Sequence, residues 1–262
     1  MLPFITVFDK VIPTYGLLIA IGLLVANEIL YVAIIKKENM LFDDCIFIEA
    51  YLFFFGFLGA KILYIIITVC QNGFSILTNT SSLFAVVQGG FVFYGGILGG
   101  LFGAYLVKRI HNLDVLLILR KSIFMLPLVH SFGRIGCFCA GCCYGVEYHG
   151  VCSVVFPKAS LAPPYIPLFP VQIVEAVLLL TIAATVFLLI LNKKEAYSIQ
   201  IYVICYSIVR FLLEYMRGDI VRGYFIFFST SQWLSLIGLI LGIILLRKDS
   251  KNAGNTRSPD TT

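Results

Sequence analysis

Residues 171–192 read VQIVEAVLLLTIAATVFLLILN and decide the fold class. This stretch holds one charged residue, Glu175, and reaches the roughly 20 mostly apolar residues that a helix needs to cross a bilayer. We therefore predict a transmembrane helix here. Stretches of the same kind predict further spans at residues 12–35, 43–69, 88–107, 116–137, 197–216 and 230–246.

Composition supports this class for the whole chain. Of 262 residues, 60% are hydrophobic and 13% are charged, against roughly 25% charged residues in soluble domains. The mean hydropathy is +0.98, and a soluble fold of this size could not bury so much apolar surface. The sequence predicts an all-α polytopic membrane protein with about seven transmembrane helices. Arg120 and Lys121 interrupt the fourth span, so we expect its first turns to lie along the membrane interface.

Basic residues between the spans predict the orientation. Cytoplasmic loops carry an excess of lysine and arginine, and four basic pairs fall on one side of the predicted spans. We therefore expect the N-terminus outside and the C-terminus in the cytoplasm. The pairs are Lys36 with Lys37, Lys108 with Arg109, Lys193 with Lys194, and Arg247 with Lys248.

No domain boundary is evident within the apolar part of the chain. We predict a single transmembrane domain over residues 1–246, with outer loops at about 70–87 and 138–169. Residues 247–262 are polar and basic, which predicts a disordered cytoplasmic tail. Most of the net charge of +5 lies in short loops. The preference for basic residues in cytoplasmic loops explains this charge. We expect membrane lipids as partners and no nucleic acid.

Several ionisable groups fall within the predicted spans or at their outer ends. Such groups are costly at membrane depth and mark functional sites. Tyr206, Arg210 and Glu214 recur every four residues and share one helical stripe. An ion pair tying helices together is one explanation. We favour an anion site, such as a phospholipid phosphate held by the two donors of an arginine, because cations outnumber carboxylates among Lys61, Arg134, Arg210, Glu175 and Glu214.

Glycines dominate residues 88–100, which read QGGFVFYGGILGG. Small residues in membrane helices serve close packing, and this explanation is strongest for Gly99 and Gly100. Two glycine pairs bracket Tyr94, and such pairs loosen a helix. Non-helical backbone at membrane depth is tolerated where it lines a cavity. Packing and a cavity both remain open for the glycines around Tyr94.

Four of the eight cysteines lie in one short run, C-x-C-x-x-C-C, at residues 137–143. Structural zinc sites usually pair two such knuckles, and no second one is present, so metal binding is the explanation we favour least and no metal is predicted. A disulfide is compatible with the oxidising outer side, with Cys152 as one candidate partner. We favour packing of small apolar side chains. The run comprises Cys137, Cys139, Cys142 and Cys143.

Several motifs, taken in order, resemble those of the prolipoprotein diacylglyceryl transferase family. The resemblance extends from about Pro13 to Leu246. YGL at 15–17 resembles the tyrosine motif of the first span, and GAK at 59–61 with Tyr64 resembles G-x-R-x-x-Y. Residues 89–96 resemble G-G-x-x-F-H-G-G, and residues 133–145 resemble G-R-x-G-N-F-x-N-G-E-x-x-G. Pro170, Gln172 and Glu175 resemble P-x-Q-x-x-E, and the motif of the penultimate helix is matched by Tyr206, Arg210, Glu214, Arg217 and Asp219.

The resemblance implies a reaction in the bacterial cytoplasmic (inner) membrane. The family moves the diacylglyceryl group of phosphatidylglycerol to the lipobox cysteine of a prolipoprotein signal peptide. A thioether forms, glycerol phosphate leaves, and no metal or cofactor is needed. By resemblance Arg134, Arg210 and Tyr94 are catalytic, with the arginines offsetting charge on the leaving group. The residues implied to bind phosphatidylglycerol are Arg134, Arg210, Tyr15, Tyr206, Glu214, Gly145, Cys137 and Cys142.

Three departures from the family pattern bear on the chemistry. Tyr94 stands in place of histidine, Cys137 in place of asparagine and Cys142 in place of glutamate. The acceptor thiol must lose a proton, and a phenol with an ordinary pKa of about 10 is a poor base. His130, one turn before Arg134, is another candidate base. Two alternatives stay open: a divergent member with another acceptor, and a phospholipid-binding or transport protein without catalysis.

Overall fold

The computed structural model describes residues 4–7, 10–38, 40–73, 84, 86, 89–158, 160–219 and 224–255. The described chain is mostly helical and divides into two compact units. The larger unit comprises Met1–Lys37 and Leu119–Thr262, and the smaller unit comprises Glu38–Ile118. Each unit is described by itself below. The all-α membrane class predicted from the sequence is confirmed.

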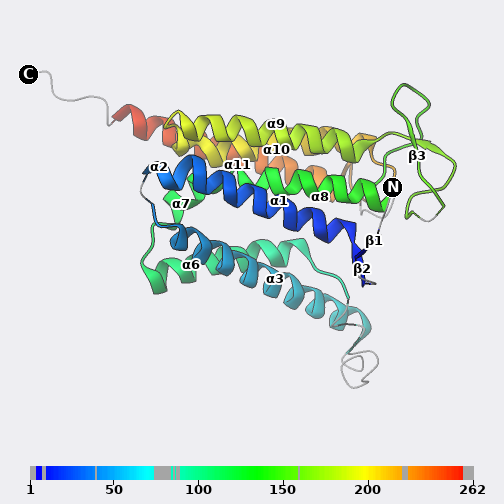
Figure 1. Cartoon of the computed structure of the whole chain (residues 1–262), viewed down its shortest axis with the longest axis horizontal. Coiled ribbons are helices and arrows are strands. Elements are labelled where there is room, and N and C mark those ends of the chain that lie inside the picture. The colour runs from blue at the N-terminus through cyan, green and yellow to red at the C-terminus, as the bar shows by residue number, and fades with distance from the viewer. Residues whose placement is uncertain are drawn as a thin grey trace, which may run out of the picture. The chain divides into compact units, whose positions relative to one another are not determined.

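Five long helices form the larger unit. Figure 1 shows them side by side, with α1 packed on α8, α8 on α9, α9 on α10 and α10 on α11. Their apolar side chains make the core, and Leu30 of α1 and Leu179 and Val186 of α9 are almost completely buried. The bounds are α1 Thr14–Leu30, α8 Met125–Ala140, α9 Val171–Leu191, α10 Ser198–Leu213 and α11 Thr230–Asn255. Past α1 the chain stays helical through η1 Tyr31–Ile35 and α2 Lys36–Glu38.

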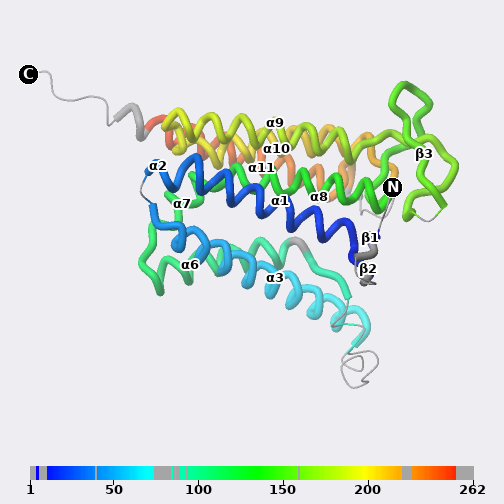
Figure 2. The backbone as a smooth tube through the Cα atoms, viewed as in Figure 1, coloured from blue at the N-terminus to red at the C-terminus, as the bar shows by residue number. Residues whose placement is uncertain are grey.

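The connection between α8 and α9 forms a lobe at one end of these helices (Figure 2). Its centre is a short antiparallel pair, β3 Val154–Val155 with β4 Pro167–Leu168, and Phe156, Ala162 and Leu168 form its own small core. Two further hairpins pair β1 Phe4–Val7 with β2 Lys10–Pro13, and β5 Tyr224–Phe225 with β6 Phe228–Ser229.

Backbone hydrogen bonds tie this lobe to the chain that follows α10. The short helix η3 Glu214–Met216 ends α10, and the next residues run extended beside the lobe. The Val146 N–H donates to the Met216 carbonyl at 3.0 Å, and the Gly218 N–H donates to the Tyr144 carbonyl at 3.0 Å. The end of α8 and the end of α10 are thereby held together.

In the smaller unit, α3 Phe42–Asn72 packs closely against α6 Phe93–His111. A Cβ on Gly59, Gly95 or Gly99 would collide with the backbone of the opposite helix. These glycines therefore permit the two backbones to approach. Close packing is confirmed for Gly99, whereas Gly100 has no atom within 4 Å of such a Cβ.

Five of the described helical segments are long and apolar enough to cross a membrane, and α7 Val115–Ser122 with α8 makes a sixth if the bent pair counts as one span. The pair is bent by 47°, next to the charged residues that we expected to disturb the start of this span. The helix α6, at the predicted span 88–107, is not among these six. Glycines dilute its apolar residues, and its last turn holds Lys108, Arg109 and His111.

The predicted domain limits and outer loops stay predictions. Most of the loop expected at 70–87 lies outside the described residues. The tail was predicted to begin at residue 247, whereas α11 continues to Asn255; residues 256–262 lie outside the described part of the chain.

Candidate active site

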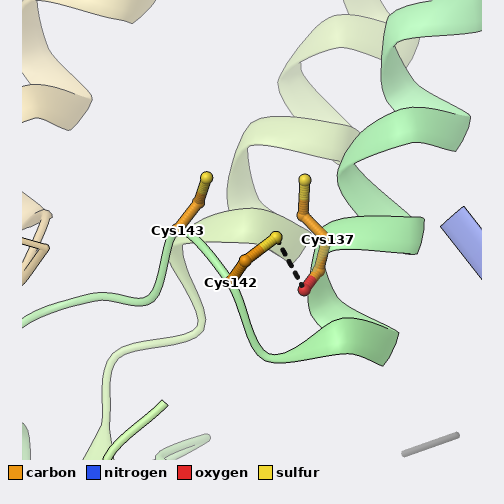
Figure 3. Close-up of side chains that lie close together, drawn as sticks. All are labelled: Cys137, Cys142 and Cys143. Atoms are coloured by element: carbon orange, nitrogen blue, oxygen red, sulfur yellow. Dashed lines mark hydrogen bonds between the residues drawn. The ribbon is translucent and has the colours of Figure 1, made fainter. Parts of the chain in front are cut away.

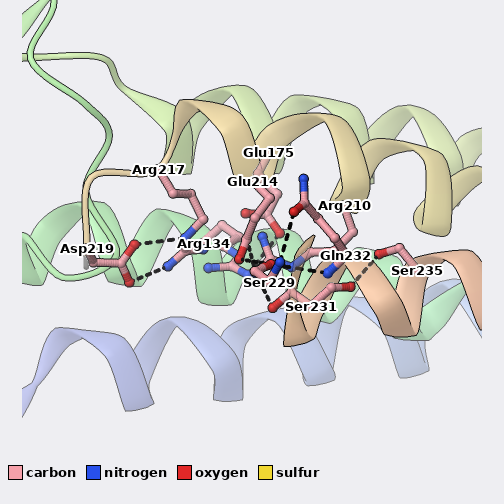
Figure 4. A network of polar contacts seen from close by, with 10 residues as sticks. All are labelled: Arg134, Glu175, Arg210, Glu214, Arg217, Asp219, Ser229, Ser231, Gln232 and Ser235. Carbon is pink, nitrogen blue, oxygen red and sulfur yellow. Dashed lines mark hydrogen bonds and ion pairs between the residues drawn. The ribbon is translucent and has the colours of Figure 1, made fainter. Parts of the chain in front are cut away.

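Three arginines, from α8, α10 and the segment after η3, lie in one polar network inside the larger unit (Figure 4). The first is Arg134 on α8, whose Nη2 atom lies 2.8 Å from Glu175 Oε1 on α9. Glu175 comes shortly after the start of α9 at Val171, and its side chain is completely buried. A carboxylate buried this deeply needs a cation, and the Arg134 guanidinium supplies it.

Arg210 occupies the centre of the network. Its Nη2 atom lies 2.7 Å from Glu214 Oε2, one turn further along the chain, and 3.0 Å from Ser231 Oγ at the start of α11. Glu214 is also buried, and its Oε1 accepts a hydrogen bond from Ser229 Oγ at 2.7 Å. The Arg210–Glu214 ion pair proposed from the sequence is therefore present, and Ser229 of β6 and Ser231 of α11 support it.

Arg217 follows η3 with an extended backbone and pairs with Asp219. Its Nε donates to Oδ1 at 2.9 Å and its Nη2 to Oδ2 at 2.8 Å, which is the two-point geometry that arginine favours with carboxylates. The lobe holds this segment in place, because Arg217 forms a backbone bridge with Gly145. A Cβ on Gly145 would collide with the Phe169 carbonyl oxygen and lie 3.0 Å from that of Met216, so this glycine lets the lobe approach the segment that holds Arg217.

Each of the three arginines has a carboxylate partner. The excess of cations counted from the sequence included Lys61, which belongs to the smaller unit. The pairs use only part of each guanidinium, however. Arg134 Nε and Arg210 Nη1 are buried and have no hydrogen-bond partner among the described residues. Buried donors without partners are costly, and an anion would satisfy them.

Tyr206 lies on α10, one helical turn before Arg210, and contacts Arg134 of α8. Its hydroxyl hydrogen-bonds with Arg134, and its ring stacks on Tyr202 at a centroid distance of 5.9 Å. The His130 ring meets Tyr206 edge-on at 5.6 Å. Both Arg134 and Arg210 act electrostatically on His130. The role of His130 as a base stays a prediction.

Tyr15 approaches the same region from the first turn of α1. A Cβ on Gly136 of α8 would lie 2.9 Å from the Tyr15 Cα, so the missing side chain lets α1 come close to α8. Tyr15 interacts electrostatically with Arg134 and Cys137, yet 44% of its surface stays exposed. It is therefore available to a ligand beside Arg134.

Three cysteines meet where α8 ends. The Sγ atoms of Cys137, Cys142 and Cys143 all lie within 4.8 Å of one another (Figure 3). Gly141 ends α8 with a positive φ of 71°, and Cys143 has a φ of 57°. This turn brings Cys142 back to α8, where its N–H donates to the Cys137 carbonyl at 3.1 Å. Gln172 of α9 fixes the turn by donating to the Cys142 carbonyl at 2.9 Å.

All eight cysteines are free thiols, and Cys152, the suggested disulfide partner, is exposed. The pKa of the Cys143 thiol is lowered from its ordinary value, because the Cys137 and Cys142 thiols hydrogen-bond to it and the Arg217 guanidinium lies beside it. Cys137 is buried and Cys139, Cys142 and Cys143 are partly buried, so the packing role favoured from the sequence stays a prediction.

Tyr94 belongs to the smaller unit, in the first turn of α6, and is half-exposed. Five residues before Tyr94, the Gly89 carbonyl accepts a hydrogen bond from Lys61 Nζ of α3 at 3.0 Å. The same Nζ lies 5.0 Å from the Tyr64 ring centre. Gly89 also packs against Tyr64. The larger unit brings together the other site residues predicted from the sequence, and the role of Tyr94 stays a prediction.

Sequence reasoning missed two parts of the site. It assigned Cys143 no role, because the C-x-C-x-x-C-C spacing alone does not show which sulfurs converge. It also missed the polar start of α11, where the Ser229 N–H donates to Gln232 Oε1 at 3.0 Å. The run STSQ at 229–232, at the head of an apolar span, was an available signal.

Comparison with known proteins gives the same family as the motifs in the sequence. The sequence pattern of the prolipoprotein diacylglyceryl transferase family matches residues 4–247. The chain is 36% identical over 245 residues to phosphatidylglycerol–prolipoprotein diacylglyceryl transferase 2 of Clostridium perfringens, covering 91% of each protein. It is 36% identical to the Clostridium tetani enzyme, covering 90% of this chain and 92% of that protein. The Clostridioides difficile enzyme is 29% identical, with 94% and 96% covered.

Proposed function

Because the chain belongs to the prolipoprotein diacylglyceryl transferase family, we propose that it carries out the first step of lipoprotein maturation. The donor is phosphatidylglycerol and the acceptor is the lipobox cysteine thiol of a prolipoprotein. The protein works as a multi-pass enzyme of the bacterial cytoplasmic membrane, with about seven spans, its N-terminus outside and its C-terminus in the cytoplasm. The basic pairs between the spans support this orientation.

The observation that carries the proposal is the pair of buried arginine donors without partners. Arg134 Nε and Arg210 Nη1 come from two different helices of one unit. In our proposal they bind the phosphate of phosphatidylglycerol, while Glu175 and Glu214 hold the two guanidinium groups in place. Tyr15 and Tyr206 orient the headgroup, and Gly145, Cys137 and Cys142 complete its surroundings.

In the proposed reaction, the arginines stabilise the negative charge that develops on the leaving group. The acceptor thiol loses its proton, and its sulfur attacks the glycerol carbon that is bonded to the phosphate oxygen. A C–S bond forms, the C–O bond breaks, and its electron pair stays on the oxygen of the departing glycerol phosphate. The leaving group gains one negative charge, and arginines placed beforehand stabilise that charge in the transition state. Tyr94 is proposed to position a reacting group, on the strength of its motif position.

The arginine roles are tested in liposomes that contain phosphatidylglycerol and a lipobox peptide. Arg134→Ala and Arg210→Ala should each lower the rate of peptide lipidation by about 100-fold or more, as for other groups that stabilise developing charge. Arg247→Ala is the matched control, because this arginine is exposed near the end of α11 and should leave the rate unchanged. Unchanged lipidation in both site variants would refute their role.

A further inference from the structure

The three cysteines at the end of α8 form a cluster whose thiol groups have no chemical role in the phosphate binding proposed above. Their Sγ atoms lie within 4.8 Å of one another. In a tetrahedral zinc site with Zn–S bonds of about 2.3 Å, the sulfurs are about 3.8 Å apart. Small rotations of the side chains would therefore bring the three sulfurs to the spacing that one metal ion requires.

The three ligands come from a stiff frame. Cys137 is buried in the last turn of α8, and the Gly141 turn presents Cys142 and Cys143 from the opposite side. Backbone and Gln172 hydrogen bonds hold that turn. Among the described residues, no fourth histidine, cysteine or carboxylate joins the group. Three protein ligands with one open position are the arrangement of a catalytic zinc site, whereas structural sites are closed by four.

The surrounding charges suit such an ion. Three thiolates and one Zn²⁺ carry a net charge of −1. The Arg217 guanidinium lies beside Cys143, and Arg134 acts electrostatically on Cys137. Arg134 and Cys137 are three residues apart on α8 and so share one face, about a helical turn apart. The thiol cluster is therefore next to the proposed phosphate site.

We propose that Cys137, Cys142 and Cys143 bind one Zn²⁺ ion, whose open position takes the thiol of the acceptor cysteine. The inference rests on the proposed function, and it supplies what the chemistry there still lacks. A thiol bound to zinc is deprotonated, and the thiolate is the nucleophile. The acceptor proton passes to solvent when the sulfur binds the metal, so the histidine replaced by Tyr94 is not required.

The group transfer balances with the metal in this place. The bound thiolate sulfur forms the C–S bond, the C–O bond to the phosphate breaks, and glycerol phosphate leaves with the electron pair. The product sulfur is a neutral thioether, which binds zinc more weakly than a thiolate. The product therefore leaves the metal open for the next acceptor. One metal site accounts for Cys137 and Cys142 together and compensates for the third departure, Tyr94.

Metal content gives the first test. The full-length protein, purified in detergent with reductant and without added metal, should contain about one zinc per chain by elemental analysis, and added Co²⁺ should give thiolate-to-cobalt charge-transfer absorption. Cys142→Ser and Cys143→Ser should each lose both signals. Cys139→Ser is the matched control, because Cys139 lies in the same run but outside the cluster, and it should keep both.

Activity gives the second test. Removing zinc with a chelator should lower peptide lipidation by about 100-fold, the low end of what catalytic assistance with a proton transfer contributes, because the acceptor thiol must then lose its proton without the metal. Adding Zn²⁺ should restore the rate. An active wild-type protein that holds no zinc and resists the chelator overturns the zinc site but leaves the proposed function standing. A protein that binds zinc at the three cysteines but lipidates no lipobox peptide refutes the proposed function and the acceptor role of the metal. The inference is also overturned if the reduced protein gives no cobalt absorption. A disulfide between two of the three cysteines in freshly purified protein would overturn it as well.

Discussion

At the scale of single residues, the site depends on how each arginine is held. Sequence spacing identified the Arg210–Glu214 pair, because its partners are one helical turn apart. The Arg134–Glu175 pair joins two helices and is not encoded in any local spacing. The thiol cluster was equally hidden, because the positive φ of Gly141 and Cys143 decides which sulfurs meet.

Glu175→Gln tests whether Arg134 needs its buried carboxylate. The substitution removes the charge that orients the guanidinium but preserves the volume of the side chain. We expect peptide lipidation to fall by about 100-fold, because an Arg134 guanidinium that is out of place stabilises the leaving group as poorly as one that is missing. We also expect the free energy of unfolding to fall by about 3–5 kcal/mol, because a buried cation loses its partner.

Glu147→Gln is the matched control for that experiment, because Glu147 is largely exposed in the lobe. It should retain wild-type activity and stability in liposome assays and thermal unfolding. Normal lipidation by a folded Glu175→Gln protein would contradict the assigned role of this ion pair.

At the scale of elements, apolar length was the reliable signal. The span predicted at residues 171–192 is α9, Val171–Leu191, one residue shorter than predicted. The predicted span over 88–107 became α6, which begins at Phe93 and whose glycines pack against α3. Hydropathy does not reveal such a partner, because packing between helices depends on shape. The charged residues Arg120 and Lys121 predicted a disturbed start of the fourth span, and the chain is bent there.

Gly99→Ala tests the packing of α3 on α6. The new methyl group would meet the Phe55 carbonyl, so we expect a loss of about 1–3 kcal/mol in stability, as for other overpacked positions. Gly100→Ala, its neighbour, faces open space and should match the wild-type protein. Thermal unfolding in detergent measures both variants. Equal midpoints would show that the two backbones are not in close contact.

At the scale of the whole molecule, composition alone established a polytopic membrane protein, and the helices agree. The orientation of the protein in the membrane does not follow from composition, because it depends on the charges in the loops. Cys152 offers a test, since it is exposed in the lobe that we expect outside. A membrane-impermeant maleimide should label Cys152 in intact cells. A cysteine introduced by Lys194→Cys should react only after the cells are opened, and the reverse pattern would contradict the orientation.

The most direct measurement follows both halves of the donor lipid. Phosphatidylglycerol is labelled with one isotope in its diacylglyceryl part and another in its headgroup glycerol, then incubated with the protein and a lipobox peptide. The account predicts that the diacylglyceryl label appears on the peptide cysteine in a bond that resists hydroxylamine, while an equal amount of headgroup label appears in glycerol phosphate. Headgroup label on the acceptor, or no transfer of either label, would contradict it.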